Sequence, residues 1–403
     1  MRTYFADLHI HIGRSSDGRA VKVTASRDLT FENICIECVD RKGIEIAGMI
    51  DCASPGVLRD IDLLLESGQM VPQPGGGLRY RDRLTVILGS ELETREVDGG
   101  LSHVLCYFPT VDAIRGFAHA LSGYVSNLQL SSQQCHMPAN DLALIAVDHG
   151  GFVVPAHAFT PHKSLYGSCA DRIGRVFGPK ALSGIAAIEL GLSADTDLAD
   201  RLSELAEVSF LSNSDAHSLP KIAREYNVLR MESDSWEELS LALRRQDGRG
   251  VVGNYGMDPR LGKYHRTFCE ECGQVVTAEP PARACTRCGG TKVTFGVLDR
   301  IVEIADRPSP VHPPHRPPYH HQVPLQFVPK LGAVAMTRLL NRFGSEMAVL
   351  HHAAPDELAS VVGTRLAEHI VAARDGSLLL QPGGGGRFGR VVASPRGAQL
   401  RLL

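Results

Sequence analysis

The sequence carries metal-ligand side chains at five points where a short apolar run ends. They are Asp7-Leu8-His9-Ile10-His11 after Tyr4–Ala6, Asp51 after Met49-Ile50, Glu91 after Leu88, His157 after Val153–Ala156, and Asp215-Ala216-His217 after Phe210-Leu211. If the apolar runs are strands of a parallel α/β fold, their carboxyl ends gather at one edge, where sites form. Imidazole combined with carboxylate is the ligand mixture of zinc, manganese or iron rather than calcium.

Such a cluster favours hydrolytic chemistry, because clustered cations activate water and stabilise the leaving oxygen of a phosphate ester. The alternative is that each histidine is an isolated core or surface residue. That alternative suits any single position, but five strand ends together argue against it. No glycine-rich nucleotide loop and no nucleophile elbow competes with the metal interpretation.

A second set of metal-ligand residues consists of two Cys-x-x-Cys pairs with twelve residues between them, Cys269 with Cys272 and Cys285 with Cys288. Each pair is followed by glycine, which lets the backbone turn around an ion. Four thiolates at this spacing predict one structural zinc ion in a zinc ribbon. Two disulfides are the alternative, which a reducing cytoplasmic compartment opposes.

The first 250 residues alternate between apolar runs and helical patterns, which favours a parallel α/β sheet, either open or closed into a barrel. Thr30 and Gly43 are placed to begin and end a helix over 31–42, and a second helical pattern covers 197–206. The predicted strands are Tyr4–Ala6, Ile44–Ile50, Thr85–Leu88, Phe152–Ala156, Ala186–Leu190 and Ser209–Ser212.

Composition and charge divide the 403 residues further. Residues 1–260 carry a net charge of −9 and residues 261–403 one of +6, which suggests two tasks. We predict a catalytic domain over 1–260, a four-cysteine module over 261–300, a Pro/His-rich extended connector over 301–329, a helical domain with a Gly-rich loop over 330–393, and a tail over 394–403. No apolar run is long enough to span a bilayer and the start lacks a signal-peptide core, so we expect a cytoplasmic protein with no membrane partner.

The basic back half has features of DNA binding. Helical patterns over 331–375 contain two apolar-x-x-Gly turns, at Gly332 and Gly363, which resemble helix-hairpin-helix motifs that offer backbone N–H groups to phosphates. A plain helical domain with basic solvated faces is the alternative. Arg387 and Phe388 follow four consecutive glycines and could approach a phosphate or a base, or belong to a flexible loop.

The front-half motifs resemble those of the polymerase-and-histidinol-phosphatase (PHP) superfamily, whose fold is a distorted seven-stranded β/α barrel with a trinuclear metal centre. The resemblance implies a first ion held by His9, His11, Glu91 and Asp215, a second held by Glu91, His103 and His157, and a third held by His217 with Asp17 and Asp51. Cys52-Ala53-Ser54 stands where the superfamily usually places a histidine. We therefore expect two to three divalent ions (Zn, Mn or Mg), with His9, His11, Glu91, His103, His157, Asp215 and His217 as the catalytic set.

The whole order, a PHP-type barrel, a four-cysteine module, a helical domain and Gly-Gly-Gly-Gly-Arg-Phe-Gly, resembles the endonuclease Q family. The resemblance implies a DNA repair nuclease that hydrolyses the phosphodiester bond 5′ of uracil, hypoxanthine, xanthine or an abasic site, leaving a 3′-hydroxyl and a 5′-phosphate. A lesion inside a duplex would have to be flipped into a pocket. DNA with damaged bases is therefore the expected partner.

Two other functions remain open from the sequence. A small-molecule phosphomonoesterase of the histidinol-phosphatase kind needs the barrel alone and leaves the back half unexplained. A non-catalytic DNA-binding or scaffold protein with a decayed site is suggested only by the missing histidine after Asp51. At the end of the chain, Gln399–Leu403 is similar to short peptides that dock on the sliding clamp, which makes the clamp a possible partner.

Overall fold

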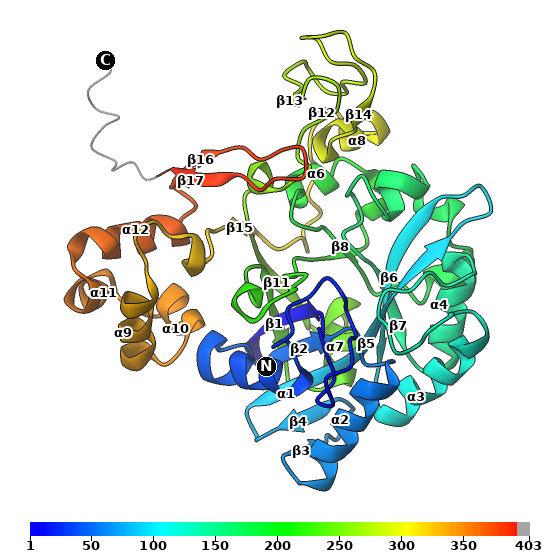
Figure 1. Ribbon diagram of the computed structural model, residues 1–403, viewed down its shortest axis with the longest axis vertical. Coiled ribbons are helices and arrows are strands. Elements are labelled where there is room, and N and C mark those ends of the chain that lie inside the picture. Colours follow the sequence, from blue (N-terminus) through cyan, green and yellow to red (C-terminus); the bar gives the residue numbers. More distant parts are fainter. Residues whose placement is uncertain (393–403) are drawn as a thin grey trace.

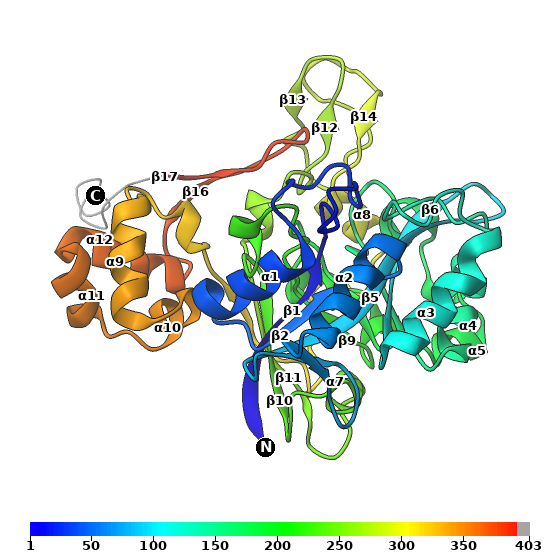
Figure 2. The same cartoon turned by 60° about the horizontal axis from the view of Figure 1, so that its bottom comes forward.

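The computed structural model describes residues 1–392, and a mixed sheet of ten strands forms its centre (Figures 1 and 2). Its strands are β1 (Arg2–Ile10), β2 (Ile46–Met49), β3 (Met70–Pro72), β4 (Leu78–Tyr80), β5 (Leu84–Arg95), β6 (Leu101–Phe108), β7 (Phe152–Pro155), β10 (Tyr226–Met231), β11 (Gly250–Gly256) and β15 (Tyr319–His321). The order is β15-β11-β10-β1-β2-β5-β4-β3, and β5 also pairs with β6, which pairs with β7.

Two further strands close this sheet into a ring. They are β8 (Ala187–Glu189) and β9 (Ser209–Leu211), which pair in parallel. The start of β8 is joined to β7, since Val153 N–H donates to Gly184 O at 3.0 Å and Ala186 N–H donates to Val153 O at 3.0 Å. After β9 the chain returns to β1, where His11 N–H donates to Ala216 O at 3.1 Å. The chain is thus an α/β protein built on a closed barrel, as its sequence predicts.

The predicted strands all form, but the expected parallel sheet is only partly correct. Strands β1, β2 and β5 are parallel neighbours, whereas β1–β10, β5–β6 and β6–β7 are antiparallel. A tight turn at Glu96–Gly100, closed by Glu96 N–H donating to Gly100 O at 2.8 Å, forces β6 to run back along β5. Strands β1 and β5 are also longer than predicted, so His9 and Glu91 lie inside strands rather than after them.

Short helices cover the barrel. They are α1 (Phe31–Glu37), α2 (Pro55–Glu66), α3 (Val111–Ala120), α4 (Ala139–Asp148), α5 (Pro179–Leu182), α6 (Thr196–Ala199) and α7 (Trp236–Leu243). The predicted 31–42 helix begins with Thr30 capping Asn33 N–H, continues as a π-helical turn over Cys38–Lys42 and ends at Gly43 with φ 76°. The predicted 197–206 helix is broken into α6 and a 3-10 turn, because Asp200 between them is buried against residues of the connector.

The four-cysteine module is a small three-stranded sheet followed by a helix, above the barrel in Figure 1. It contains β12 (Phe268–Cys269), β13 (Gln274–Val275), β14 (Val293–Thr294) and α8 (Val297–Ile304). Beyond it, the Pro/His-rich segment is not wholly irregular as expected. Its residues 319–321 form β15, which pairs in parallel with β11 and so joins the connector to the barrel sheet.

The C-terminal region is helical as predicted, with α9 (Ala333–Phe343), α10 (Glu346–His351), α11 (Pro355–Val362) and α12 (Thr364–Arg374). It docks on the barrel beside α1, where the buried Lys42 Nζ lies 3.0 Å from Glu346 Oε2. A hairpin of β16 (Leu379–Gln381) and β17 (Arg390–Val392) then crosses from the helices to the four-cysteine module (Figure 2). The tail with Gln399–Leu403 lies outside the described residues, and no helix of the described part is long and apolar enough to cross a membrane.

Candidate metal centre and adjoining cavity

Six of the predicted ligands meet at one end of the barrel in two groups. His9, His11 and Asp215 form the first group, and Glu91, His103 and His157 form the second. Within each group one ligand atom per residue lies within 4.8 Å of the others. The residues come from β1, β5 and β6 and from the segments that follow β1, β7 and β9, so the barrel itself brings them together.

The two imidazoles of the first group are aimed by carboxylates behind them. His9 Nδ1 lies 2.9 Å from Glu189 Oε2, and His11 Nδ1 lies 3.1 Å from Asp51 Oδ2. Their Nε2 atoms therefore face inward, 3.5 Å and 3.4 Å from Asp215 Oδ1. The buried His9 Nε2 has no hydrogen-bond partner. A buried, unpaired nitrogen held in place by a carboxylate on the opposite ring atom is the arrangement of a metal-ligating histidine, so these residues fit an ion.

Glu91 connects the two groups. Its Oε1 lies 2.9 Å from His103 Nδ1, 3.6 Å from His157 Nε2 and 3.8 Å from His9 Nε2, while its Oε2 lies 3.6 Å from His11 Nε2. The Glu91 side chain is 1% exposed. A buried carboxylate whose two oxygens face imidazoles of both groups can bridge two ions.

The ionised carboxylates of the centre also favour the binding of cations. Burial alone would raise the pKa of Glu91, but His103 and Lys22 outweigh it and hold the pKa well below its usual range. Burial lowers the pKa of His9, yet Glu189, Asp215 and Glu91 together raise it to about 10. The carboxylates thus stay ionised and attract positive charge. A bound metal ion would supply that charge and would displace the proton from the His9 imidazole.

Two of these ligands have strained backbone. His157 has φ 31° and Asp215 has φ 45°, values that residues with a side chain rarely adopt. Around His157 the backbone is fixed by its N–H, which donates to Glu189 Oε1 at 3.2 Å, and by Gly191, where a Cβ atom would lie 2.8 Å from His157 Cβ. Such strain persists where the surroundings impose it and is concentrated at functional sites.

The three residues expected at a third ion are not brought together. Asp17 lies in an exposed loop, where Ser15 Oγ donates to it at 2.6 Å and Arg59 pairs with it at 3.1 Å. Asp51 accepts from Ile12 N–H at 2.6 Å and contacts His11 Nδ1, the ring nitrogen that does not face Asp215. His217 lines a cavity next to the ligand groups, described below, with its Nδ1 3.0 Å from Asp215 O. Within the described residues, these side chains form no third ligand group.

Two residues of the centre were missed by the sequence analysis. Glu189 is fully buried and supports His9, His157 and Asn213, whose Nδ2 donates to Glu189 Oε2 at 3.0 Å. A carboxylate within the apolar run 186–190 was the signal for it. Lys22 lies 3.0 Å from Glu91 Oε2, and nothing in the surrounding sequence, Val21-Lys22-Val23, marks it as a site residue.

Next to the metal groups lies a cavity of about 450 Å³, walled on one side by His157, Asp215 and His217. Three cations, Lys221, Arg224 and Lys263, also line this cavity, and none of them forms an ion pair within the described residues. The Arg224 guanidinium donates to the carbonyl oxygens of Ser214 and Asp215, at 2.7 Å and 3.2 Å. Burial, together with the charges of Arg224 and Lys263, lowers the pKa of Lys221. Unneutralised cations beside a metal centre suit a phosphate-bearing substrate.

The four residues expected to contact DNA have different positions. Phe388 lines the cavity, with its ring 4.7 Å from Lys263 Nζ and 5.6 Å from the Arg224 guanidinium carbon. Arg387 belongs to the turn of the β16–β17 hairpin, bridged to Gly384. Gly363 separates α11 from α12 with φ 82°, as in a helical hairpin. Gly332 instead precedes α9 after a 3-10 turn at Leu325–Phe327, so only the second turn lies between two α-helices.

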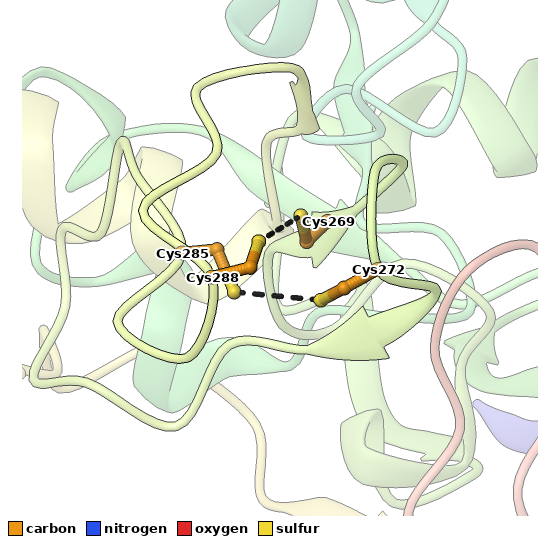
Figure 3. Close-up of side chains that lie close together, drawn as sticks. All are labelled: Cys269, Cys272, Cys285 and Cys288. Carbon is orange, nitrogen blue, oxygen red and sulfur yellow. Dashed lines mark hydrogen bonds between the residues drawn. The ribbon is translucent and has the colours of Figure 1, made fainter.

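The four cysteines of the small module form a second kind of metal site (Figure 3). Cys269 Sγ lies 3.6 Å from Cys288 Sγ, and Cys272 Sγ lies 3.7 Å from Cys285 Sγ. No disulfide joins them, since all four are free. A tetrahedral ion with bonds of about 2.3 Å to sulfur separates the sulfurs by about 3.8 Å. Backbone N–H groups of Cys288 and Arg287 lower the pKa of the Cys285 thiol to about 7, which favours the thiolate.

Comparison with known proteins finds relatives that share this architecture over nearly the whole chain. No protein-family model matches the chain. An uncharacterized protein of Bacillus subtilis strain 168, YqxK, is 47% identical over 394 residues, covering 97% of this chain and 100% of that protein. The crystal structure of the lesion-specific endonuclease PfuEndoQ from Pyrococcus furiosus has a TM-score of 0.83 and 31% identity and covers 100% of this chain and 98% of that one. A structure of endonuclease Q with a 27-mer duplex substrate carrying an abasic lesion at the active site has a TM-score of 0.82 and 32% identity, with 98% of both chains covered.

Proposed function

The chain belongs to the endonuclease Q family, and on that premise we propose that it is a metal-dependent DNA repair endonuclease. Its substrates would be duplexes with a deaminated base (uracil, hypoxanthine or xanthine) or an abasic site, cleaved on the 5′ side of the lesion. A full-length relative solved with abasic duplex DNA at its active site supports this substrate class. The observation that carries the proposal is the continuity of this chain's metal groups with a cationic cavity that includes Phe388.

We assign the metal ligands as His9, His11 and Asp215 for one ion and His103 and His157 for another, with Glu91 between them. When bound, the ions would activate water and stabilise charge at phosphorus and at the leaving oxygen. The protein's own part is to hold the ligands still. Glu189 and Asp51 fix the imidazoles of His9 and His11 from behind, and the strained backbone at Asp215 aims its carboxylate at both.

The imidazole and carboxylate ligands suit zinc or manganese better than magnesium, which prefers oxygen ligands. In the four-cysteine module we propose one structural zinc ion, since the sulfur separations match a tetrahedral site. We retain the division into a catalytic domain (1–260), a zinc module (261–300), a connector (301–329) and a helical DNA-binding domain (330–393).

On the substrate side, we propose that Lys221, Arg224 and Lys263 bind the backbone phosphates next to the lesion, and that Phe388 stacks on the displaced nucleotide. The aromatic ring lies over cations in the wall of the cavity, which is how single bases are held by stacking beside a charged groove. Gly363 between α11 and α12 would present backbone N–H groups to a more distant phosphate without reading sequence.

The test is a nicking assay with metal-loaded protein and labelled duplexes that contain one deoxyuridine or one abasic site. We expect a nick 5′ of the lesion that is absent from a thymidine duplex and abolished by EDTA. Phosphate release from small phosphomonoesters without any nick would instead establish the histidinol-phosphatase-like alternative. DNA binding without either reaction would indicate a scaffold protein.

The ligand assignment has its own test. His9→Ala and Asp215→Ala each remove a ligand of the first group and should abolish nicking while the far-ultraviolet circular dichroism spectrum stays unchanged. His119→Ala is the matched control, because His119 is exposed on α3 and belongs to neither ligand group. Near-normal turnover in either ligand variant would contradict the assignment.

We further propose that Gln399–Leu403 docks the enzyme on the sliding clamp. Deleting residues 399–403 should leave nicking of free oligonucleotides intact and weaken clamp binding, measured by surface plasmon resonance. Unchanged affinity for the clamp would reject the tail as the docking segment.

A further inference from the structure

A lysine ammonium group, that of Lys22, lies among the carboxylates of the metal centre. Lys22 Nζ lies 3.0 Å from Glu91 Oε2 and also contacts Ser132 Oγ, and its side chain is only 13% exposed. Ser132 Oγ in turn donates to the same Glu91 oxygen. Asp51 and Asp215 are the other carboxylates close enough to act on the Lys22 charge. The ammonium group thus lies among the acidic residues that would otherwise attract an additional ion.

The backbone holds Lys22 firmly at this position. Its N–H donates to Ile12 O at 2.9 Å, and the neighbouring Val21 N–H donates to Gly13 O at 2.9 Å, which pairs this loop with the chain that continues from β1. Ser131 N–H donates to Val21 O at 3.0 Å from the other side. The lysine is therefore fixed next to His11 by bonds on both sides of the loop, rather than resting on the site through side-chain contacts alone.

The two oxygens of Glu91 divide their contacts accordingly. Oε1 faces the imidazoles of His103, His157 and His9, whereas Oε2 is taken by Lys22 and Ser132 and lies farther from His11. In the described residues, the remaining candidates for a third ion do not converge. Asp17 is bound to Ser15 and Arg59, and Asp51 to Ile12 N–H and His11. Of the three candidates for a third ion, only His217 is then left to act as a ligand.

We infer that the Lys22 ammonium takes the place of a third cation beside the two proposed ions and supplies the charge that a third ion would bring. Lys22 is then a positioning residue, which fixes Glu91 between the two ions and offsets the negative charge that develops on the substrate. The inference rests on the proposed function for its activity measurement, but its metal count is independent of any substrate.

The first test is the metal content of the full chain after loading with zinc and desalting, measured by inductively coupled plasma mass spectrometry. Wild type should bind three ions per chain, two in the barrel and one in the four-cysteine module. Lys22→Met should also bind three. Four ions in wild type would overturn the inference, and so would loss of a barrel ion in Lys22→Met, since the lysine would then serve only to assemble the ligands.

The second test separates charge from structure. Lys22→Met should lower kcat for nicking a lesion duplex by about 100-fold or more with little change in KM, the usual effect of removing one fixed charge from a transition state. Lys180→Met is the matched control, because the Lys180 side chain is 71% exposed and its ammonium lies 3.7 Å from Asp148, outside both ligand groups. Wild-type kcat in Lys22→Met would refute the role.

Chemical rescue completes the design. Lys22→Ala lacks the part of the side chain that n-propylammonium would replace, so this cation should restore part of the lost kcat, and n-propanol, which has a similar shape and no charge, should not. Failure of rescue in folded, metal-loaded Lys22→Ala would reject the ammonium as the third cation. If wild type nicks no lesion duplex yet binds three ions, the proposed function fails and the cation count stands. If it nicks and binds four ions, only this inference fails.

Discussion

Arg316 offers a test of how the connector is held to the barrel. Its side chain is 1% exposed and forms a two-pronged pair with the fully buried Asp200, with N–O distances of 2.8 Å and 3.0 Å. The guanidinium also donates to Val208 O at 2.6 Å and to Leu205 O at 3.0 Å and lies 3.5 Å from the centre of the Phe210 ring. One side chain of a proline-rich segment thus joins the turns around β9.

Replacing Arg316 with methionine keeps most of the volume and removes the charge. Asp200 is then left buried with His312 Nδ1, at 2.7 Å, as a remaining side-chain partner. Breaking a buried pair by removing one member costs about 3–5 kcal/mol, because the other charge stays unpaired away from water. We therefore expect Arg316→Met to lower the free energy of unfolding by about 3–5 kcal/mol. The double variant with Asp200→Leu should lose less than Arg316→Met alone.

Urea unfolding followed by circular dichroism measures these differences. Arg307→Met is the control in the same connector, since the Arg307 guanidinium donates to the carbonyl oxygens of Asp200 and Val311, both at 3.3 Å. It should cost less than about 1 kcal/mol. A loss below about 1 kcal/mol in Arg316→Met, or additive losses in the double variant, would show that the buried pair does not hold the connector.

Three further outcomes can be measured. Burial raises the pKa of Glu225 to about 8, whereas the unfolded carboxyl ionises near pH 4.5, so the folded state loses stability as pH rises from about 4.5 to 8. In urea titrations Glu225→Gln should be more stable than wild type by about 3–5 kcal/mol at pH 8 and nearly equal to it at pH 4.5. The same difference at both pH values would contradict this. Cys285→Ser should lose one zinc ion per chain by mass spectrometry and open residues 268–294 to proteolysis while the barrel stays resistant; retention of the ion would refute the four-sulfur site. Phe388→Ala should raise KM for a lesion duplex with a smaller effect on cleavage of an abasic duplex, which lacks a base to stack, and equal changes for both duplexes would exclude stacking.

The sequence predicts the parts of the centre that depend on local order. His9, Glu91 and Asp215 were found because a strand pattern precedes or contains each of them, and the barrel brings strand ends to one edge whatever its loops do. Asp17 was placed at a third ion by the family resemblance. Its carboxylate is satisfied by Ser15 and Arg19 of its own loop and by Arg59 of α2, and such bonds are not visible in a spacing pattern.

The residues that sequence analysis missed are those whose partners are far away along the chain. Lys22 meets Glu91 and Ser132 across 69 and 110 positions, and Arg316 meets Asp200 across 116. Periodicity reports which face of a strand is buried, but it contains no information on which distant loop will cover that face. For the same reason the connector was expected to be irregular, although β15 adds to the barrel sheet.

The charge asymmetry between the two halves also has a structural explanation. The barrel gathers carboxylates, among them the buried Glu91 and Glu189 and the partly exposed Asp215, so the front half is acidic where it must attract cations. Lys263, at the start of the basic half, reaches the same cavity, and the Gly-rich hairpin returns over a hundred positions later to place Phe388 against it. Gly383 N–H donates to Arg260 O at 2.8 Å and fixes this return. The two halves therefore do not perform separate tasks, because the acidic half holds the ions and the basic half completes the wall that would receive a polyanion.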